Sequence, residues 1–405
     1  MEAAEDVVIV GAGLAGLAAA LGLHRKGVSS LVLESSPSLR ASGFAFTTWK
    51  NAFRALDALG VGDKIRRQHL QAQTLRVMVS STGEIAQEVD LTQQGKRGPN
   101  EIRCVRRDLL LQALEEELPR GTIRYSSRIV SIEEDGGVKV LQLADSSVIR
   151  AKVLVGCDGI NSVVAKWLGL ATPSYSGRSA ARGFAHYPDG HGFEPKFLQF
   201  IGDGFRSGML PCNENEIYWF FTWTPSENDK GVDESAAKMK QFVLSKLRGS
   251  KVPAEALAVI DRSEMSDVLA APLRFRSPLS LATASIARGN VCVAGDALHP
   301  MTPDLGQGGC SALEDGVVLA RCLGDALLLP AAKGKDEERV EAALREYAWI
   351  RRWRSVELVA TAYAVGFIQQ SDSAVVSFLR DRFLSGVLAR RLLKMADYDC
   401  GTLAN

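Results

Sequence analysis

Three glycines near the amino terminus have the spacing of a turn that holds the pyrophosphate of a dinucleotide. Gly11, Gly13 and Gly16 form a GxGxxG motif that follows a β-branched run and opens a helical pattern. The first glycine permits a tight turn, the second lets the backbone approach a pyrophosphate, and the third lets helix and strand pack closely. Because the N–H groups at a helix start favour negative charge, we predict a phosphate site formed by these glycines with Leu14 and Ala15.

An acidic residue at the end of the next apolar run completes this motif. Glu34 follows a short run that we predict as a second strand, and Ser35 comes directly after it. A carboxylate at this place can accept hydrogen bonds from the ribose hydroxyls of an adenosine half, and it would repel the 2′-phosphate of NADP. In this strand–helix–strand context the motif is specific for a dinucleotide, but it does not separate FAD from NAD.

A second glycine cluster far downstream separates these two cofactors. Residues 295–309 read GDALHPMTPDLGQGG directly after an apolar run. Asp158 and Asp296 each end such a run, and open α/β sheets bind ligands at the carboxyl ends of their strands. A pyrophosphate would repel Asp296, whereas the hydroxyls of a ribityl chain can donate hydrogen bonds to it. FAD has this chain and NAD lacks it.

The glycines of this second cluster precede a predicted helix. They would bring backbone N–H groups and a positive helix end to the electron-rich edge of a flavin ring. The residues expected to do so are Gly306, Gln307, Gly308 and Gly309. We therefore predict that both glycine clusters hold one extended FAD molecule.

The remaining patterns predict an α/β fold in which a second, aromatic sheet interrupts the nucleotide-binding part. Helical patterns cover residues 51–59, 107–118 and 308–328. Between about 175 and 280, aromatic alternating runs separated by turn residues are typical of antiparallel strands. We predict a Rossmann-type FAD-binding domain with an inserted antiparallel-sheet substrate domain and a helical C-terminal tail. The expected bounds are 1–174 for the first part of the FAD-binding domain, with substrate-domain strands at about 70–100, then 175–280 for the substrate domain, 281–330 for the return to the FAD-binding domain, and 331–405 for the helical C-terminal region.

Side chains within the aromatic runs are the candidates for contact with a substrate. Successive side chains of a strand point to opposite faces, so these runs supply both a pocket wall and a packed core. The candidates are Arg182, Phe200, Tyr218 and Phe220.

Three further features have both a functional and a structural interpretation. His299 could be catalytic, but we favour a structural role because a buried histidine usually has a local partner. We expect Cys310 to pack or to cap rather than to react. The basic run 351–354 could bind an anionic partner, but we predict a solvated helix face whose long side chains extend to water.

The composition is that of an ordinary globular protein and argues against several classes of function. The 405 residues include 48 basic and 47 acidic ones, so a net charge of +1 predicts no nucleic-acid partner. No stretch approaches the ~20 apolar residues of a membrane span. Seven scattered cysteines without metal-type spacing predict no metal site and a reducing compartment. We expect a cytoplasmic protein, with a removed organellar presequence as the alternative, and the sequence leaves the oligomeric state open.

The ordered set of motifs resembles the three fingerprints of the class A FAD-dependent monooxygenases, which share the para-hydroxybenzoate hydroxylase fold. These fingerprints are GAGLAG with Glu34, Cys157-Asp158-Gly159, and GDALHPMTPDLGQGG. The details most resemble the plant monooxygenase-2-like branch, as do SVVAKWLG at 162–169 and the closing DYDCGTL. The resemblance spans nearly the whole chain.

The resemblance implies roles at matching positions. Arg107, in a pattern with Leu110 and Leu114, matches an arginine that contacts the cofactor. Asp158 matches an aspartate that serves both FAD and the nicotinamide cofactor. Pro303 matches the residue beside the isoalloxazine ring, where it would border both the flavin hydroperoxide and the substrate. One departure concerns NAD(P)H handling, because Ala165 and then Lys166 stand where relatives often have an arginine.

The implied function is that of a monooxygenase. NADH or NADPH would reduce FAD, O2 would add at the flavin C4a, and the resulting hydroperoxide would deliver one oxygen atom to a small aromatic or heteroaromatic substrate. The alternatives are a flavin-bound reductase or oxidase, a redox-uncoupled regulatory flavoprotein on the same fold, and an NAD-dependent dehydrogenase, which would be colourless rather than yellow.

Overall fold

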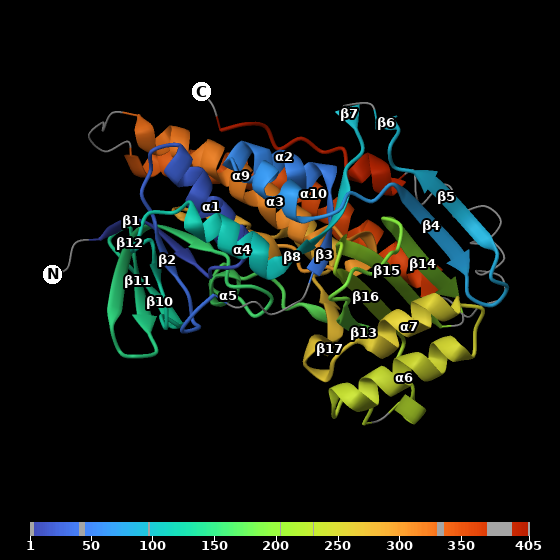
Figure 1. The fold of residues 1–405 in the computed structure, drawn as a ribbon. Helices are drawn as coiled ribbons and strands as arrows, with labels where there is room; N and C mark the ends of the chain where they lie inside the picture. Colours follow the sequence, from blue (N-terminus) through green and yellow to red (C-terminus); the bar gives the residue numbers. More distant parts are fainter. Residues whose placement is uncertain are drawn as a thin grey trace.

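A computed structural model describes residues 4–39, 45–95, 98–202, 204–229, 231–329, 336–370 and 391–403. Two β-sheets lie next to one another along the molecule, and helices cover both of them (Figure 1). The first sheet is at the left of this view and the second is at the right. Among the described helices, none combines the length and the apolar character needed to cross a bilayer.

The first sheet has eight strands, and its centre is parallel. Its main path runs in the order β10-β11-β12-β1-β2-β9, with β19 paired to β12 and β18 paired to β19. The strands are β1 (Glu5–Val10), β2 (Leu31–Leu33), β9 (Ile123–Arg124), β10 (Ile129–Asp135), β11 (Val138–Leu143), β12 (Val148–Gly156), β18 (Ala287–Arg288) and β19 (Val291–Val293). Because β12, β1 and β2 run in the same direction, the turns that follow all three open at one edge of the sheet.

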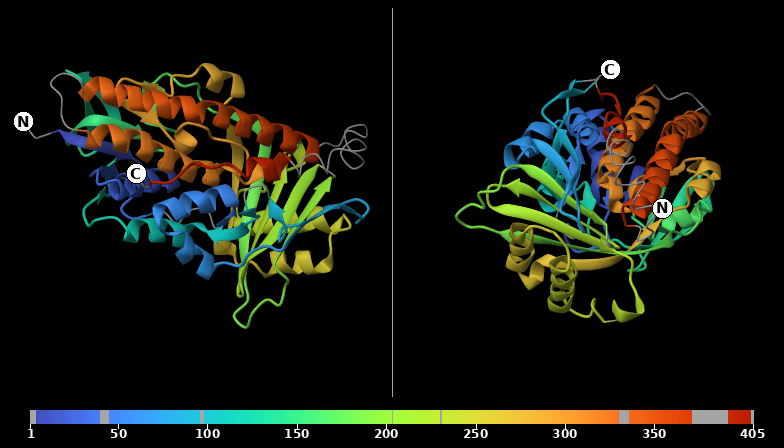
Figure 2. Two further views of the ribbon diagram at one scale, coloured as in Figure 1. Left: turned by 90° about the horizontal axis from the view of Figure 1, so that it is seen from above. Right: turned by 90° about the vertical axis from the view of Figure 1, so that its right-hand side faces the viewer.

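Long helices cover this sheet and run side by side along the molecule (Figure 2). They are α1 (Leu14–Arg25), α9 (Gly308–Leu328) and α10 (Asp336–Gln370). The smaller helices are α2 (Lys50–Leu59), α3 (Gly62–Gln68), α4 (Arg107–Glu116), α5 (Val163–Trp167) and α8 (Pro278–Thr283). The helices predicted at 51–59, 107–118 and 308–328 are therefore confirmed, with ends within two residues of the expected ones.

The second sheet has seven strands in the order β17-β13-β16-β15-β14-β4-β5. Its strands are β4 (Thr74–Val79), β5 (Ile85–Asp90), β13 (Ser174–His186), β14 (Lys196–Gly202), β15 (Phe205–Asn213), β16 (Glu216–Trp223) and β17 (Val268–Phe275). All neighbours are antiparallel except β14 and β4, which are parallel. Two helices, α6 (Ala236–Arg248) and α7 (Ala254–Arg262), cover the lower face of this sheet in Figure 1.

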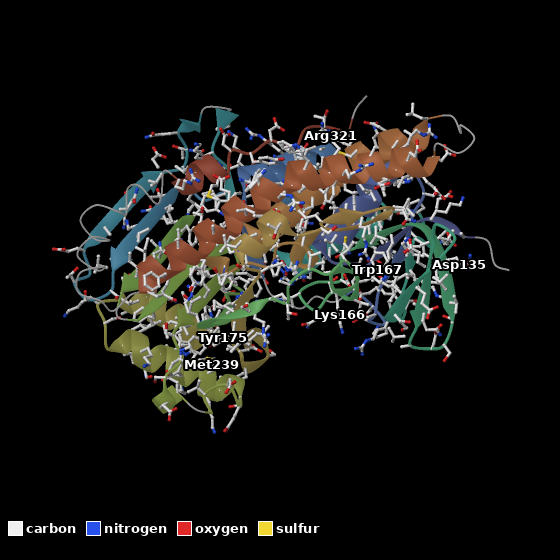
Figure 3. All side chains as sticks on the ribbon, turned by 180° about the vertical axis from the view of Figure 1, so that it is seen from behind. Asp135, Lys166, Trp167, Tyr175, Met239 and Arg321 are labelled. Atoms are coloured by element: carbon white, nitrogen blue, oxygen red, sulfur yellow. The ribbon has the colours of Figure 1, made fainter. Side chains whose placement is uncertain are left out.

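Two hydrophobic cores stabilise the molecule. Met239 of α6, labelled in Figure 3, packs in the core between the second sheet and its two helices. The larger core lies around the first sheet, α1 and α9, and it continues onto the other face of the second sheet, where it includes Phe184 and Phe197. The remaining strands form two short pairs, which are β3 (Ala45–Trp49) with β8 (Ile102–Arg106), and β6 (Gln94–Gly95) with β7 (Gly98–Pro99). The 3-10 turns are η1 (Glu227–Asp229), η2 (Met265–Asp267), η3 (Gly295–Ala297) and η4 (Pro303–Leu305).

Candidate active site

One cavity of about 840 Å³ extends from the first glycine turn to the inner face of the second sheet. Most of the predicted site residues line it. They are Gly11, Gly13, Leu14, Ala15, Glu34, Ser35, Arg107, Asp158, Arg182, Tyr218, Phe220, Asp296, Pro303, Gly306, Gly308 and Gly309. The structure thus brings together segments from both sheets that are far apart in the sequence.

The first turn leaves room for a phosphate at one glycine and none at the other two. Gly11 has φ +98°, and a Cβ there would lie 2.5 Å from the Cys157 carbonyl oxygen. A Cβ on Gly16 would lie 1.9 Å from the Gly11 carbonyl oxygen, so this residue serves the packing of helix against turn. A Cβ on Gly13 would meet nothing within 4 Å, and α1 begins directly afterwards without a side-chain cap. Its first N–H groups therefore face open space beside the turn.

Glu34 supports this turn and faces the cavity at the end of β2. Its Oε2 accepts a hydrogen bond of 2.9 Å from the Ala12 N–H, and its Oε1 accepts one of 2.8 Å from the Ser36 N–H. The carboxylate is thereby fixed between the two loops. Its remaining lone pairs can accept hydrogen bonds from the hydroxyl groups of a ribose.

Arg107 brings a guanidinium to the middle of the cavity from the first residue of α4. Its Nε is buried and has no hydrogen-bond partner among the described residues. Burial lowers the pKa of Arg107, and the carboxylate of Asp296 across the cavity opposes this effect. An unpartnered buried N–H in a cavity wall needs an acceptor that the described side chains do not supply, and a cofactor oxygen fits this need.

Asp158 has a structural task in addition to its place in the cavity wall. Its carboxylate accepts hydrogen bonds from Ser162 Oγ and from the Val163 N–H, and so caps the short helix α5. Burial raises the pKa of Asp158. Ala165 is buried in α5 and Lys166 points to solvent (Figure 3), so neither lines the cavity.

The second glycine loop presses against β3. Gly306 has φ +63°, and a Cβ on Gly309 would lie 2.7 Å from the ring of Phe46. The side chain of Gln307 points away from the cavity, because it is buried and accepts a hydrogen bond of 2.8 Å from Asn51. Gln307 can therefore offer only its backbone to a ligand.

The inner face of the second sheet forms the far wall of the cavity. Alternate side chains of its strands face the cavity, including Arg182, Tyr218 and Phe220. Phe200 does not, because it lies in the core against α6 and α7 on the opposite face. The expectation that Phe200 lines the pocket does not hold, because its position on β14 directs the side chain to the face that packs against α6 and α7. Phe197 and Gln199 of the same strand line the cavity instead.

Arg206 is a pocket residue that the sequence reasoning missed. Only 5% of it is exposed, its guanidinium lies 5.2 Å from the ring centre of Phe220, and its Nη2 donates a 3.2 Å hydrogen bond to Gln199. Its Nε has no partner among the described residues, and burial lowers its pKa. Alternation along the strand, counted from the apolar residues on either side, could have placed it on the inner face.

Comparison with known proteins decides the family. Residues 4–362 match the family described as FAD binding domain. The chain belongs to this family, the class A flavin monooxygenases. It is 48% identical to Monooxygenase 2 of Arabidopsis thaliana and 36% identical to Monooxygenase 1 of the same plant, and each alignment covers at least 98% of both chains. A solved structure of Klebsiella pneumoniae HpxO with FAD and uric acid shares the fold, with a TM-score of 0.83 at 24% identity over 99% of this chain and 98% of that one.

The family resemblance, the α/β fold class and the FAD cofactor predicted from the sequence are confirmed by these matches. The geometry of this flavin monooxygenase fits FAD at both ends of the cavity. The open Gly13 and the uncapped start of α1 suit a pyrophosphate, and the unpartnered Arg107 suits an anionic or carbonyl oxygen. Asp296 is exposed within the cavity and suits a chain of hydroxyl groups.

Behind the second glycine loop, the flavin monooxygenase holds a buried cluster of charged side chains. Arg351 has 0% exposure and pairs with Glu314 at 2.8 Å and with Asp315, while Arg354 pairs with Glu314 at 2.9 Å. The prediction of a solvated basic helix face is therefore wrong. The sequence pattern did not show that two carboxylates of α9 lie directly opposite these arginines.

His299 belongs to this buried cluster. Its Nε2 lies 2.6 Å from Asp315 Oδ2, which also accepts the Gly295 N–H at 2.7 Å. The favoured structural interpretation of His299 agrees with this geometry, because its partner holds the turn that carries Asp296. Cys310 packs in the same region, with its sulfur 3.4 Å from the Gly306 carbonyl oxygen, as expected.

Proposed function

We propose that this protein is an FAD-dependent monooxygenase that consumes NADH or NADPH and inserts one oxygen atom from O2 into a small aromatic or heteroaromatic substrate. The observation that carries the proposal is the single cavity that joins the glycine turn of the first sheet to the aromatic, arginine-bearing wall of the second. A flavin that spans the first part would place its reactive end beside this wall. FAD, when bound, supplies the redox and oxygen chemistry.

The protein's own residues would bind and orient the cofactor. Gly13 and the first turn of α1 would hold the pyrophosphate, and Glu34 would bind the ribose. Arg107 would bind a cofactor oxygen, and Asp296 would bind the ribityl hydroxyls. Asp158 would serve the cofactor from its place as the cap of α5. The loop that holds Gly306, Gly308 and Gly309 would lie beside the ring, with backbone N–H groups toward its electron-rich edge.

The substrate would lie between Pro303 and the inner face of the second sheet. Phe220 and Phe197 offer aromatic faces, while Arg182 and Arg206 offer guanidinium groups. Burial raises the pKa of Tyr218 to about 12, so its hydroxyl keeps its proton near neutral pH and can donate to a substrate oxygen. This combination suits a flat ring that carries a carbonyl, carboxylate or phenolate oxygen, and uric acid in the related HpxO structure is a ligand of this kind.

Pro303 would limit the approach to the ring rather than take part in proton transfer. It opens the 3-10 turn η4, where its fixed φ favours the turn and its missing N–H costs no hydrogen bond. The apolar ring would help to exclude water from the reacting centre.

The test is anaerobic reduction of the purified yellow protein by NADH and by NADPH, with and without a panel of aromatic acids and purines. The proposal expects that one compound accelerates reduction at least about tenfold and that, in air, oxygen uptake equals the hydroxylated product formed. Reduction that no compound accelerates, with all oxygen recovered as H2O2, would instead establish a flavin oxidase or a redox-uncoupled flavoprotein.

A further inference from the structure

Two buried cysteines meet where β8 contacts β15. Cys104 and Cys212 are 108 positions apart in the sequence, and their sulfur atoms lie 2.7 Å apart. Both residues are fully buried. An S–S bond measures about 2.05 Å, so this separation is within about 0.7 Å of a bond.

A β-bulge directs Cys212 toward its partner. The pairing of β15 with β16 shifts between Pro211 and Asn213, so Cys212 is an extra residue of β15. Its carbonyl oxygen, which the ladder no longer uses, accepts a 2.7 Å hydrogen bond from the Leu70 N–H. Bulges commonly re-aim a side chain beside a functional site, and here the side chain reaches Cys104 on another sheet.

The surroundings of the pair decide how it can react. Burial raises the pKa of Cys104 well above its ordinary value, and the neighbouring Cys212 adds to this effect. The Cys104 thiol therefore stays protonated near neutral pH, and its oxidation is slow compared with that of an exposed thiolate. Once formed, a bond at this buried place is equally hard for a reductant to reach.

We propose that Cys104 and Cys212 are an oxidisable pair that hydrogen peroxide converts into a disulfide between β8 and β15. One sulfur attacks a peroxide oxygen, the O–O bond breaks, and a sulfenic acid and water form. The second sulfur then attacks the sulfenic sulfur, the S–O bond breaks, and a second water leaves with the remaining thiol proton. The balance is two thiols and one H2O2 to one disulfide and two H2O.

The bond would join the two halves of the cavity wall. Strand β8 leads directly into Arg107, and β15 carries Arg206, so the disulfide would hold the cofactor side against the substrate side. Closing a chain segment of this length also restricts the unfolded state. The proposal does not need the proposed function, although uncoupled turnover of a flavin monooxygenase would release peroxide nearby.

The experiment uses the full chain with its cofactor, treated with increasing H2O2, then denatured, alkylated and digested with trypsin. Cleavage after arginine and lysine places Cys104 in peptide 104–106 and Cys212 in peptide 207–230, each with one cysteine. We expect the two peptides to be recovered joined, two hydrogen masses below their sum, with at least a tenfold rise over protein kept in reductant. Cys322, the one half-buried cysteine, reports that peroxide has reacted.

Matched variants separate this bond from general oxidation. Cys212→Ser should abolish the joined peptide, while Cys322→Ser should leave it unchanged. Peroxide should raise the Tm of the wild type and of Cys322→Ser by several degrees, but not that of Cys212→Ser. Recovery of Cys104 and Cys212 as two alkylated thiols or two separate sulfinic acids, after Cys322 has been oxidised, would overturn the proposal. The peptide result on the wild type tests the proposal even if Cys212→Ser folds poorly.

Discussion

Arg178 and Asp304 form a buried bidentate ion pair between the second sheet and the loop that the flavin ring would adjoin. The two guanidinium nitrogens lie 2.9 and 2.7 Å from the two carboxylate oxygens. Arg206 of the pocket wall approaches the same carboxylate at 3.5 Å. A Cβ on Gly366 of α10 would lie 2.2 Å from Arg178, so this glycine leaves the space that the guanidinium occupies. The pair fixes Pro303, the neighbour of Asp304, relative to Arg206.

Replacement of Asp304 by Asn should destabilise the protein strongly. Arg178 and Arg206 would both remain buried near a neutral amide, and loss of one partner of a buried ion pair costs about 3–5 kcal/mol. Urea unfolding of the variant and of the wild type measures this difference. Glu234→Gln is the matched control, because it breaks the exposed pair with Lys238 and should leave the free energy of unfolding close to that of the wild type. Equal losses for the two variants would show that Asp304 does not hold the loop.

The two first glycines of the turn should respond differently to alanine. Gly11→Ala adds a Cβ at φ +98° and 2.5 Å from a carbonyl oxygen, so the apoprotein should lose about 1–3 kcal/mol of unfolding free energy. Gly13→Ala adds a Cβ into open space, so the apoprotein should stay within about 0.5 kcal/mol of the wild type. The added methyl should nevertheless raise the Kd for FAD at least about tenfold, because it occupies the place of the pyrophosphate. Urea unfolding of the apoproteins and titration of FAD fluorescence give the two quantities, and a wild-type Kd for Gly13→Ala would contradict the assigned phosphate site.

Two phenylalanines on opposite faces of the second sheet give a third test. Phe220→Ala removes a ring from the cavity wall, and we expect substrate affinity to fall about tenfold or more. Phe200→Ala removes a ring from the core against α6 and α7, so it should cost about 3–5 kcal/mol of stability. Its Kd for the same ligand should stay within about twofold. Binding can be followed by the change in flavin absorbance with an aromatic acid, and unfolding by urea, and the reverse pattern would refute the orientation of the sheet.

The sequence predicted the elements whose signals are local. The glycine turn, the acidic end of β2 and the start of α9 each follow from residues within a short segment, and the structure places them as elements at the expected positions. The family fingerprints then gave the fold, because they occur in the order that the fold requires. The pocket wall was harder, since the face to which Phe200 or Arg206 points depends on register with neighbouring strands.

Charge pairing across the fold was not accessible from the sequence. Arg351 and Arg354 have the spacing of an exposed basic face, yet they lie opposite Glu314 and Asp315 of α9. The task of Asp158 as the cap of α5 depends equally on a turn that only the folded chain shows. In both cases tertiary contacts decide which partner the side chain has. The residue type alone is compatible with an exposed side chain and with a buried, paired one.

The buried cluster should make stability depend on pH in a defined window. Burial alone would raise the pKa of Asp315, but the charges of His299 and Arg351 and the hydrogen bonds from His299 and Gly295 lower it to about 2. A carboxyl with a lowered pKa in the folded state contributes stability that is present above its unfolded pKa, near 3.9, and is lost as the pH falls toward 2. The free energy of unfolding in urea should therefore fall by roughly 2–3 kcal/mol more in the wild type than in Asp315→Asn between pH 4.5 and 2.

The Asp315→Asn variant should be less stable than the wild type at pH 7, because Arg351 and His299 lose a buried partner. Its free energy of unfolding should also decline less steeply as the pH falls. Asp135→Asn, a change at an exposed carboxyl on β10, should keep the wild-type decline. Parallel curves for the wild type and Asp315→Asn would mean that the Asp315 carboxylate is not what ties α9 to α10 and to the turn at Gly295.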